Sequence, residues 1–118
     1  MNRAVEFHKE GYNCAESILK ALNEEKGLDI PVSMASPFGS GMTVGSTCGA
    51  VTGALMAIGA LKGRESSENV NGTKQVTREL MDKVREKYET FQCMELKRKD
   101  VSCNEIIEYS YNMLKEFL

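Results

Sequence analysis

The order of hydrophobic and polar residues along the chain predicts helices separated by short polar or glycine-rich connections. A first helix is expected over about Asn2–Glu10, and a second begins after Asn13 and ends at Gly27. Asn13 followed by Glu16 is the pattern of a capping box, in which each side chain bonds the other residue's backbone N–H. Apolar residues then recur at helical spacing, which indicates one face turned toward a core.

The segment Cys48–Leu61 is apolar nearly all round, so we expect it to be the buried central helix. Gly49, Gly53 and Ala57 repeat every four residues along it. Small side chains at this spacing form one ridge on a helix, and such a ridge lets a neighbouring backbone approach closely.

The remaining segments follow the same alternation of helix and connection. Pro31 opens a short helical turn, and Pro37–Gly45 reads as a glycine-rich loop. A polar connection over Gly63–Gly72 precedes an amphipathic helix over about Thr73–Phe91, and a last helix begins after Ser102. No strand-like alternation is present. The sequence therefore predicts an all-α fold, a compact bundle of about five helices around a buried central one.

Length and charge restrict the classes of function. The 118 residues suit one helical domain spanning 1–118. The net charge of −2 argues against nucleic-acid binding, which requires a basic surface. The longest weakly polar stretch is too short for a membrane span of about 20 residues. With no apolar leader over Met1–Glu10, we expect a cytoplasmic protein that engages neither nucleic acid nor membrane.

The four cysteines, Cys14, Cys48, Cys93 and Cys103, are the strongest chemical signal. In the cytoplasm thiols stay reduced, so these residues are more readily explained as catalytic or metal-bound than as structural disulfides. They form no Cys-x-x-Cys pair, and their separations are long and irregular. Any common site must therefore be assembled by folding.

Three of these cysteines fall at predicted helix starts. Cys14, Cys48 and Cys103 each directly follow a capping residue, which for Cys48 is Thr47. Unpaired N–H groups give a helix start partial positive charge, which favours a thiolate. Cys93 comes just after the long amphipathic helix, where a turn can bring it toward Cys103. We therefore expect the four to act as catalytic thiols or as metal ligands, against the alternative that they are small core residues.

Other residues carry weaker signals. His8 is the only histidine, and a surface or packing role is the simpler explanation for it. Gly39, Gly41 and Gly45 lie in a loop that lacks the lysine of a phosphate-binding loop. A tight turn of the chain is the simpler explanation of this loop. As the alternative, these glycines together with Gly49 are candidates for letting a cofactor approach the start of the central helix.

Four parts of the chain carry a family resemblance. They are the run 11–16 (GYNCAE), the glycine loop 38–42, the run 47–54 (TCGAVTGA) and the late pair Cys93 and Cys103. With these parts the chain resembles the redox-active proteins named for their C_GCAxxG_C_C cysteine pattern, over most of its length.

The resemblance implies a bacterial or archaeal protein that is redox-active or metal-binding through its cysteines. The family's cysteines correspond to Cys14, Cys48, Cys93 and Cys103 of this chain. The central motif departs from the family name, because Thr47 stands before the central cysteine and Gly49 stands between that cysteine and the alanine.

Three functions remain open from the sequence. The first is a thiol oxidoreductase in which Cys93 and Cys103 cycle between dithiol and disulfide, with Cys14 or Cys48 as attacking or resolving thiol. The second is a metalloprotein in which all four cysteines bind zinc or an iron–sulfur cluster. Both imply a redox partner of unknown identity. The third is a non-catalytic interaction module or homodimer that packs through the glycine ridge.

Overall fold

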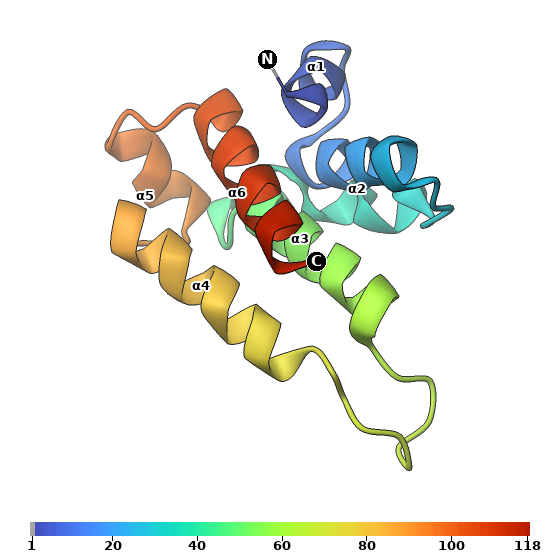
Figure 1. Ribbon diagram of the computed structural model, residues 1–118. Coiled ribbons are helices and arrows are strands. Elements are labelled where there is room, and N and C mark those ends of the chain that lie inside the picture. The colour runs from blue at the N-terminus through green and yellow to red at the C-terminus, as the bar shows by residue number, and fades with distance from the viewer. Residues whose placement is uncertain (1) are drawn as a thin grey trace.

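A computed structural model describes residues 2–118 and consists of helices joined by short connections (Figure 1). The α-helices are α1 (Arg3–Lys9), α2 (Cys14–Lys26), α3 (Gly49–Lys62), α4 (Lys74–Tyr88), α5 (Cys93–Arg98) and α6 (Cys103–Phe117), and two shorter turns are η1 (Val32–Phe38) and η2 (Gly41–Gly45). Within residues 2–118 the sole extended pairing is one antiparallel bridge between Thr47 and Gln92. The predicted all-α fold class is confirmed.

Helix α3 forms the centre of the bundle, with α2 on one side and α6 on another. Its Val51, Ala54 and Ile58 are fully buried. Burying a side chain of the size of valine or isoleucine contributes about 1.5–3 kcal/mol, so this helix adds to a core that α2 and α6 complete with buried side chains of their own. The prediction of a buried central helix holds over its first three turns, whereas the last turn extends past the bundle and leaves Leu61 exposed.

The glycine ridge of α3 is covered by α2. A Cβ atom built on Gly53 would lie 2.8 Å from the Cα of Ala15, and one on Gly49 would lie 3.1 Å from the Cβ of Cys14. The predicted close backbone approach is therefore confirmed, and its occupant is α2 of the same chain. One result is that the starts of α2 and α3, each marked by a cysteine, are held side by side.

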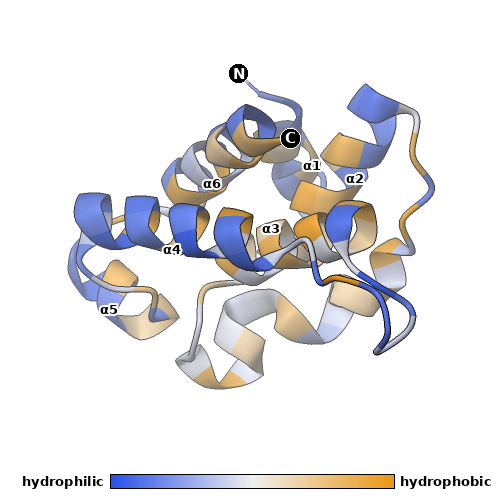
Figure 2. Cartoon of the chain, turned by 60° about the horizontal axis from the view of Figure 1, so that its bottom comes forward, coloured by the Kyte–Doolittle hydropathy of each residue, from blue (hydrophilic) through white to orange (hydrophobic). Residues whose placement is uncertain are grey.

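Helix α4 lies on the outside of the bundle and has one apolar stripe. Leu80, Val84 and Tyr88 are buried against the core, while the opposite face is hydrophilic, as Figure 2 shows. The helix ends at Tyr88 because Glu89 adopts a left-handed backbone with φ of 63°. The sequence-based end at Phe91 was therefore three residues too late.

The segment after α4 is more regular than the sequence predicted. Gln92 pairs with Thr47, and the six-residue helix α5 begins at Cys93. We expected a connection here because so short a helix offers too few apolar positions to show a helical period. None of the helices in residues 2–118 is both long and apolar enough to cross a membrane.

Candidate functional site

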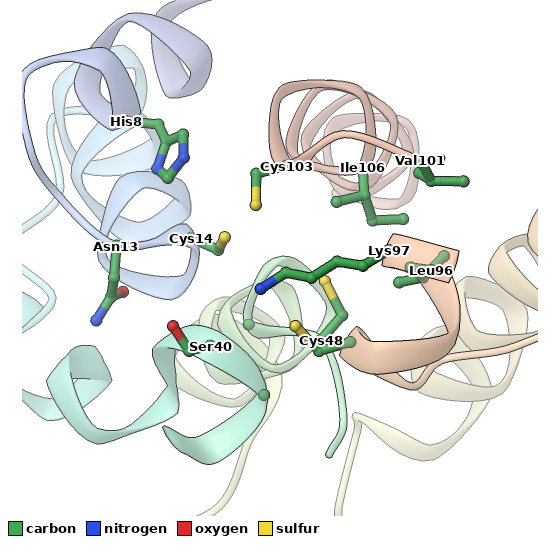
Figure 3. Close-up of a pocket in the computed structure, with 13 residues that line it drawn as sticks. His8, Asn13, Cys14, Ser40, Cys48, Leu96, Lys97, Val101, Cys103 and Ile106 are labelled. Carbon is green, nitrogen blue, oxygen red and sulfur yellow. The ribbon is translucent and has the colours of Figure 1, made fainter. Parts of the chain in front are cut away.

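A single cavity brings all four cysteines together. It has a volume of about 90 Å³ and is lined by residues from α1, α2, α3, α5, α6 and the loop before α3. Cys14, Cys48, Cys93 and Cys103 all line it, and Figure 3 shows the sulfur atoms of Cys14 and Cys103 pointing toward each other. The four cysteines that the sequence singled out as one site thus lie around one space.

Cys14 is positioned by the capping box predicted from the sequence. The backbone N–H of Glu16 donates to Asn13 Oδ1 over 2.8 Å, and the N–H of Asn13 donates to Glu16 Oε1 over 2.9 Å. Ser36 Oγ donates to the other carboxylate oxygen of Glu16 over 2.6 Å, which ties η1 to the same helix start. Cys14 is consequently the first residue of a firmly anchored helix.

Cys103 is also a first helical residue, since Ser102 caps α6 by accepting from the N–H of Glu105 over 3.1 Å. Cys48 differs from the prediction. It is itself the N-cap of α3, and the helix begins at Gly49. Thr47 does not cap the helix because its backbone is engaged in the bridge with Gln92.

The bridge between Thr47 and Gln92 sets the positions of the other two cysteines. The N–H of Cys48 donates to the Phe91 carbonyl, and the N–H of Cys93 donates to the Ser46 carbonyl, each over 2.7 Å. Side chains alternate between the two faces of an extended pair, so Cys48 and Cys93 lie on the same face, opposite to that of the bridged residues. This short pairing therefore turns both thiols toward the cavity.

His8 joins the site from α1. Its Nδ1 lies 2.9 Å from the carbonyl oxygen of Tyr12, and because a carbonyl can only accept, Nδ1 carries the proton. In the neutral ring with this tautomer, Nε2 is the nitrogen that could bind a metal. A ring held by a carbonyl in this way is the usual arrangement of a metal-binding histidine.

His8, Cys14 and Cys103 form the tightest group of ligand atoms in the cavity. The nitrogen and two sulfur atoms lie within 4.8 Å of one another. Among residues 2–118 these are the only three His, Cys, Asp or Glu side chains that meet this condition together. Cys48 and Cys93 lie outside this group although they line the same cavity.

The charges around the cavity give the cysteines different ionisation. A hydrogen bond from the Cys14 thiol, together with the nearby His8 and Lys97, lowers the pKa of Cys103 to about 5. The same hydrogen bond and burial raise the pKa of Cys14. Burial raises the pKa of Cys48 to about 11, although the N–H groups at the start of α3 oppose this shift.

With this geometry in place, the comparisons with known proteins identify the family. The family model described as "Putative redox-active protein (C_GCAxxG_C_C)" matches residues 12–117. The chain belongs to this family. The resemblance inferred from the sequence is thereby confirmed. No curated protein and no solved structure matches the chain.

The label redox-active belongs to the family as a whole, and the structure adds two residues, His8 and Lys97, to the candidate site. The sequence predicts a surface or packing role for His8 and a charged connection around Lys97. One sequence feature could have indicated that His8 lies near the cysteines. It is six residues before Cys14, and the turn at Gly11 between them folds α1 back onto the start of α2. Lys97 had no comparable signal, because the helix that carries it was not predicted.

The four glycines expected at a cofactor have different surroundings. Gly41 and Gly49 line the cavity. Gly39 packs on the side chain of Asn13, and Gly45 packs on that of Met94. Cβ atoms on Gly41 and Gly49 would lie 2.8 Å from the Cβ of Cys93 and 3.1 Å from the Cβ of Cys14, respectively. These two glycines therefore allow the cysteines to approach, while a role in holding a cofactor stays a prediction.

The loop between η1 and α3 is a left-handed turn bordering the cavity. Ser40, Met42 and Thr43 have φ of 54°, 58° and 68°, and Gly41 between them has φ of 63°. A left-handed backbone costs a residue with a side chain about 1–2 kcal/mol, and a β-branched residue suffers most. Thr43 is thus the most strained residue of this wall.

Replacing Thr43 with glycine is expected to raise the free energy of unfolding by about 1 kcal/mol. Glycine has more conformational freedom in the unfolded chain, which costs roughly 0.5–1 kcal/mol of stability. Removing the backbone strain is expected to gain more than this cost. Denaturant unfolding followed by circular dichroism measures it. Thr77→Gly in α4 is the matched control and is expected to lose about 0.4 kcal/mol, the difference in helix propensity. A loss of stability in both variants would show that the turn is unstrained.

Cys103 is expected to react with iodoacetamide at least tenfold faster than Cys48 in the metal-free, reduced protein at pH 7. With a pKa of about 5, Cys103 is already a thiolate, whereas Cys48, with a pKa of about 11, is almost entirely thiol. The lower intrinsic nucleophilicity of the weaker base reduces this advantage without cancelling it. Peptide mass spectrometry after timed quenching gives both rates.

The pH dependence of the same reaction provides the check. Between pH 8 and pH 6 the labelling rate of Cys103 stays nearly constant, because both values lie above its pKa. The rate for Cys48 falls about a hundredfold, because both values lie below its pKa. A rate for Cys103 that drops tenfold with each pH unit would mean that the neighbouring groups do not stabilise its thiolate.

Proposed function

We propose that the cavity is the redox centre of this protein and that it binds a transition metal through Cys14, Cys103 and His8. The observation that supports this most directly is the grouping of their three ligand atoms within 4.8 Å. The hydrogen bond from His8 to Tyr12 supports it further, since it leaves the other ring nitrogen free as a ligand.

The donor set agrees with metals used in redox and hydrolytic proteins. Two thiolates and an imidazole suit zinc, iron and copper, and an iron–sulfur cluster accepts the same ligand types. Three protein ligands leave a coordination position open, as in catalytic rather than structural sites. A bound transition metal would supply Lewis-acid chemistry and, if it is iron or copper, electron transfer. The residues themselves orient the ligands and keep the site partly shielded from water.

Cys48 and Cys93 act from the other wall of the cavity in this proposal. Burial keeps the Cys48 thiol protonated at neutral pH, so it is suited to donate a proton rather than to compete for the metal. The sequence also predicts that all four cysteines are ligands. Because Cys48 and Cys93 lie outside the tight group, that arrangement requires a larger centre, such as an iron–sulfur cluster, or a movement of these two residues toward the metal. The two arrangements differ in whether loss of Cys48 or Cys93 releases metal.

A second candidate is a dithiol oxidoreductase, favoured by the facing thiols of Cys14 and Cys103. Attack of the Cys103 thiolate on a disulfide of an oxidised partner protein would form a mixed disulfide, and Cys14 would then displace it. The products are a Cys14–Cys103 disulfide and the partner's two thiols, with two electrons passed to the partner. This candidate differs from the sequence-based pairing of Cys93 with Cys103, because Cys14 is in the tight group.

The proposed function requires a reducing environment. A cytoplasmic location keeps the thiols available to a metal, and the function requires an electron-carrying partner. The glycine ridge that suggested a homodimer is covered by α2, so a second copy of the chain would have to use another surface.

The deciding experiment is metal analysis with an absorption spectrum on protein purified without oxygen. The proposal expects about one metal ion per chain, with charge-transfer bands if the metal is iron or copper, and loss of the metal on addition of a chelator. A metal-free protein with four titratable thiols, which forms one reversible disulfide between Cys14 and Cys103, would overturn the metal proposal in favour of the dithiol. A metal-free protein without that disulfide would overturn both.

A further inference from the structure

The lining of the cysteine cavity is unusually poor in negative side chains for a chain with more acidic than basic residues. The sequence has 17 aspartate and glutamate residues against 15 lysine and arginine residues. None of the acidic residues is among the 13 that line the cavity, whereas Lys97 is. Apart from the cysteines and His8, Lys97 is the only ionisable group in that lining.

Lys97 lines the cavity, although the residue as a whole is exposed. Its side chain extends from α5 across the space toward Cys14 and Ser40 (Figure 3). Its charge reaches Cys103, since it helps to lower the pKa of that thiol. Among the described residues Lys97 forms no ion pair, while its neighbour Lys99 pairs with Glu89. The ammonium group therefore has no carboxylate partner within residues 2–118.

The size of the cavity limits what this cation can meet. At about 90 Å³ the space is far below the 300–1,000 Å³, roughly, of pockets for organic ligands and cofactors. It holds a few water molecules or one small ion beside a metal. A nucleotide or a flavin does not fit.

We infer that the cavity binds a small inorganic oxyanion, held by the Lys97 ammonium group next to the metal. The inference rests on the proposed function, because the negative charge of the metal-free thiol pair would repel an anion, whereas a bound divalent cation would neutralise the two thiolates that bind it. Lys97 and the three proposed ligands line the same small space. The substrate class of the redox centre is accordingly a small oxyanion rather than an organic molecule.

Lys97 could instead only balance the negative charge of the thiolates, and the two roles predict different results. A balancing lysine would change metal affinity when it is replaced, and the protein would show no affinity for anions. A lysine that holds the substrate would leave the metal content unchanged and would determine anion affinity. The metal ligands are not altered in either variant described below, so both quantities can be read from the same samples.

The test is a calorimetric titration of the metal-loaded protein with nitrite, in buffer of fixed low ionic strength and without oxygen. Lys97→Gln is expected to weaken nitrite binding about tenfold or more, because it removes the one cation in the cavity wall. Arg98→Gln is the control: it makes the same change of charge one residue later in α5, at a residue that is exposed, as Lys97 is, but does not line the cavity. It is expected to change the affinity by less than twofold. Lys97→Arg should retain most of the binding.

Three results would overturn the inference. They are the absence of nitrite binding by the metal-loaded wild type, equal affinities for Lys97→Gln and wild type, and equal losses in Lys97→Gln and Arg98→Gln. Metal analysis of the same preparations separates these from a failure of the proposed function. Full metal content without nitrite binding rejects the oxyanion alone, whereas a wild type that never takes up metal rejects the metal centre and the oxyanion together.

Discussion

Replacing Cys14 with serine is expected to reduce the affinity for the bound metal about a hundredfold or more. A complete thiolate site contributes about 10–16 kcal/mol of apparent binding energy, so each ligand accounts for about 3 kcal/mol, and a serine hydroxyl stays protonated and cannot replace a thiolate. Metal retained after dialysis against a graded series of chelator concentrations measures the loss. Cys103→Ser is expected to behave in the same way.

Cys48→Ser is the matched control for this prediction. Cys48 also lies at a helix start, and its exposed fraction of 4% is close to the 8% of Cys14, so the cost of burying a hydroxyl is similar in both variants. Under the three-ligand proposal Cys48→Ser keeps its metal. Equal loss of metal in both variants would instead support the four-cysteine ligand set expected from the sequence.

Replacing Gly53 with alanine is expected to lower the free energy of unfolding by about 2 kcal/mol, or the melting temperature by roughly 8 °C. The new Cβ would lie 2.8 Å from the Cα and 2.9 Å from the carbonyl oxygen of Ala15. Both are backbone atoms, so they cannot move aside as the end of a flexible side chain would. Helices α2 and α3 must separate, and this cost exceeds the gain of about 1 kcal/mol from alanine's helix propensity.

Gly59→Ala makes the same change two turns later in α3 and should have the opposite effect. No atom lies within 4 Å of a Cβ built on Gly59, which is exposed. Alanine there is expected to stabilise the protein by about 0.5–1 kcal/mol. If Gly53→Ala were also stabilising, the close packing of α2 on α3 would be wrong, together with the position that it gives Cys14.

The fold could be predicted from the sequence where local signals and burial agree. Asn13 with Glu16 predicted a helix start that the structure bears out, and the apolar run after Cys48 predicted the central helix. The errors occur where a long-range contact overrides a local pattern. The local pattern predicts that Thr47 caps a helix, but its pairing with Gln92, which is 45 residues away in sequence, is not visible in the neighbouring residues.

The candidate site was predicted in its components and not in its arrangement. The types and positions of the four cysteines indicated thiol or metal chemistry, and all four do line one cavity. The packing of α1 on α2, and of α6 on both, decides which cysteines lie closest together. The same packing brings His8 to them. The spacing of apolar residues shows which face of a helix is buried, but it does not show which residues of other helices will contact the first residue of that helix.

The separation of Cys14 and Cys103 along the chain gives the metal a further effect, on the unfolded protein. A ligand joined to both would close a loop of about 90 residues, and in the chain-entropy picture a permanent cross-link of that span destabilises the unfolded state by about 4–5 kcal/mol. A bound ion would thus act as a reversible cross-link between the first and last parts of the bundle. Cells that withdraw the metal would shorten the lifetime of the folded protein as well as end its chemistry.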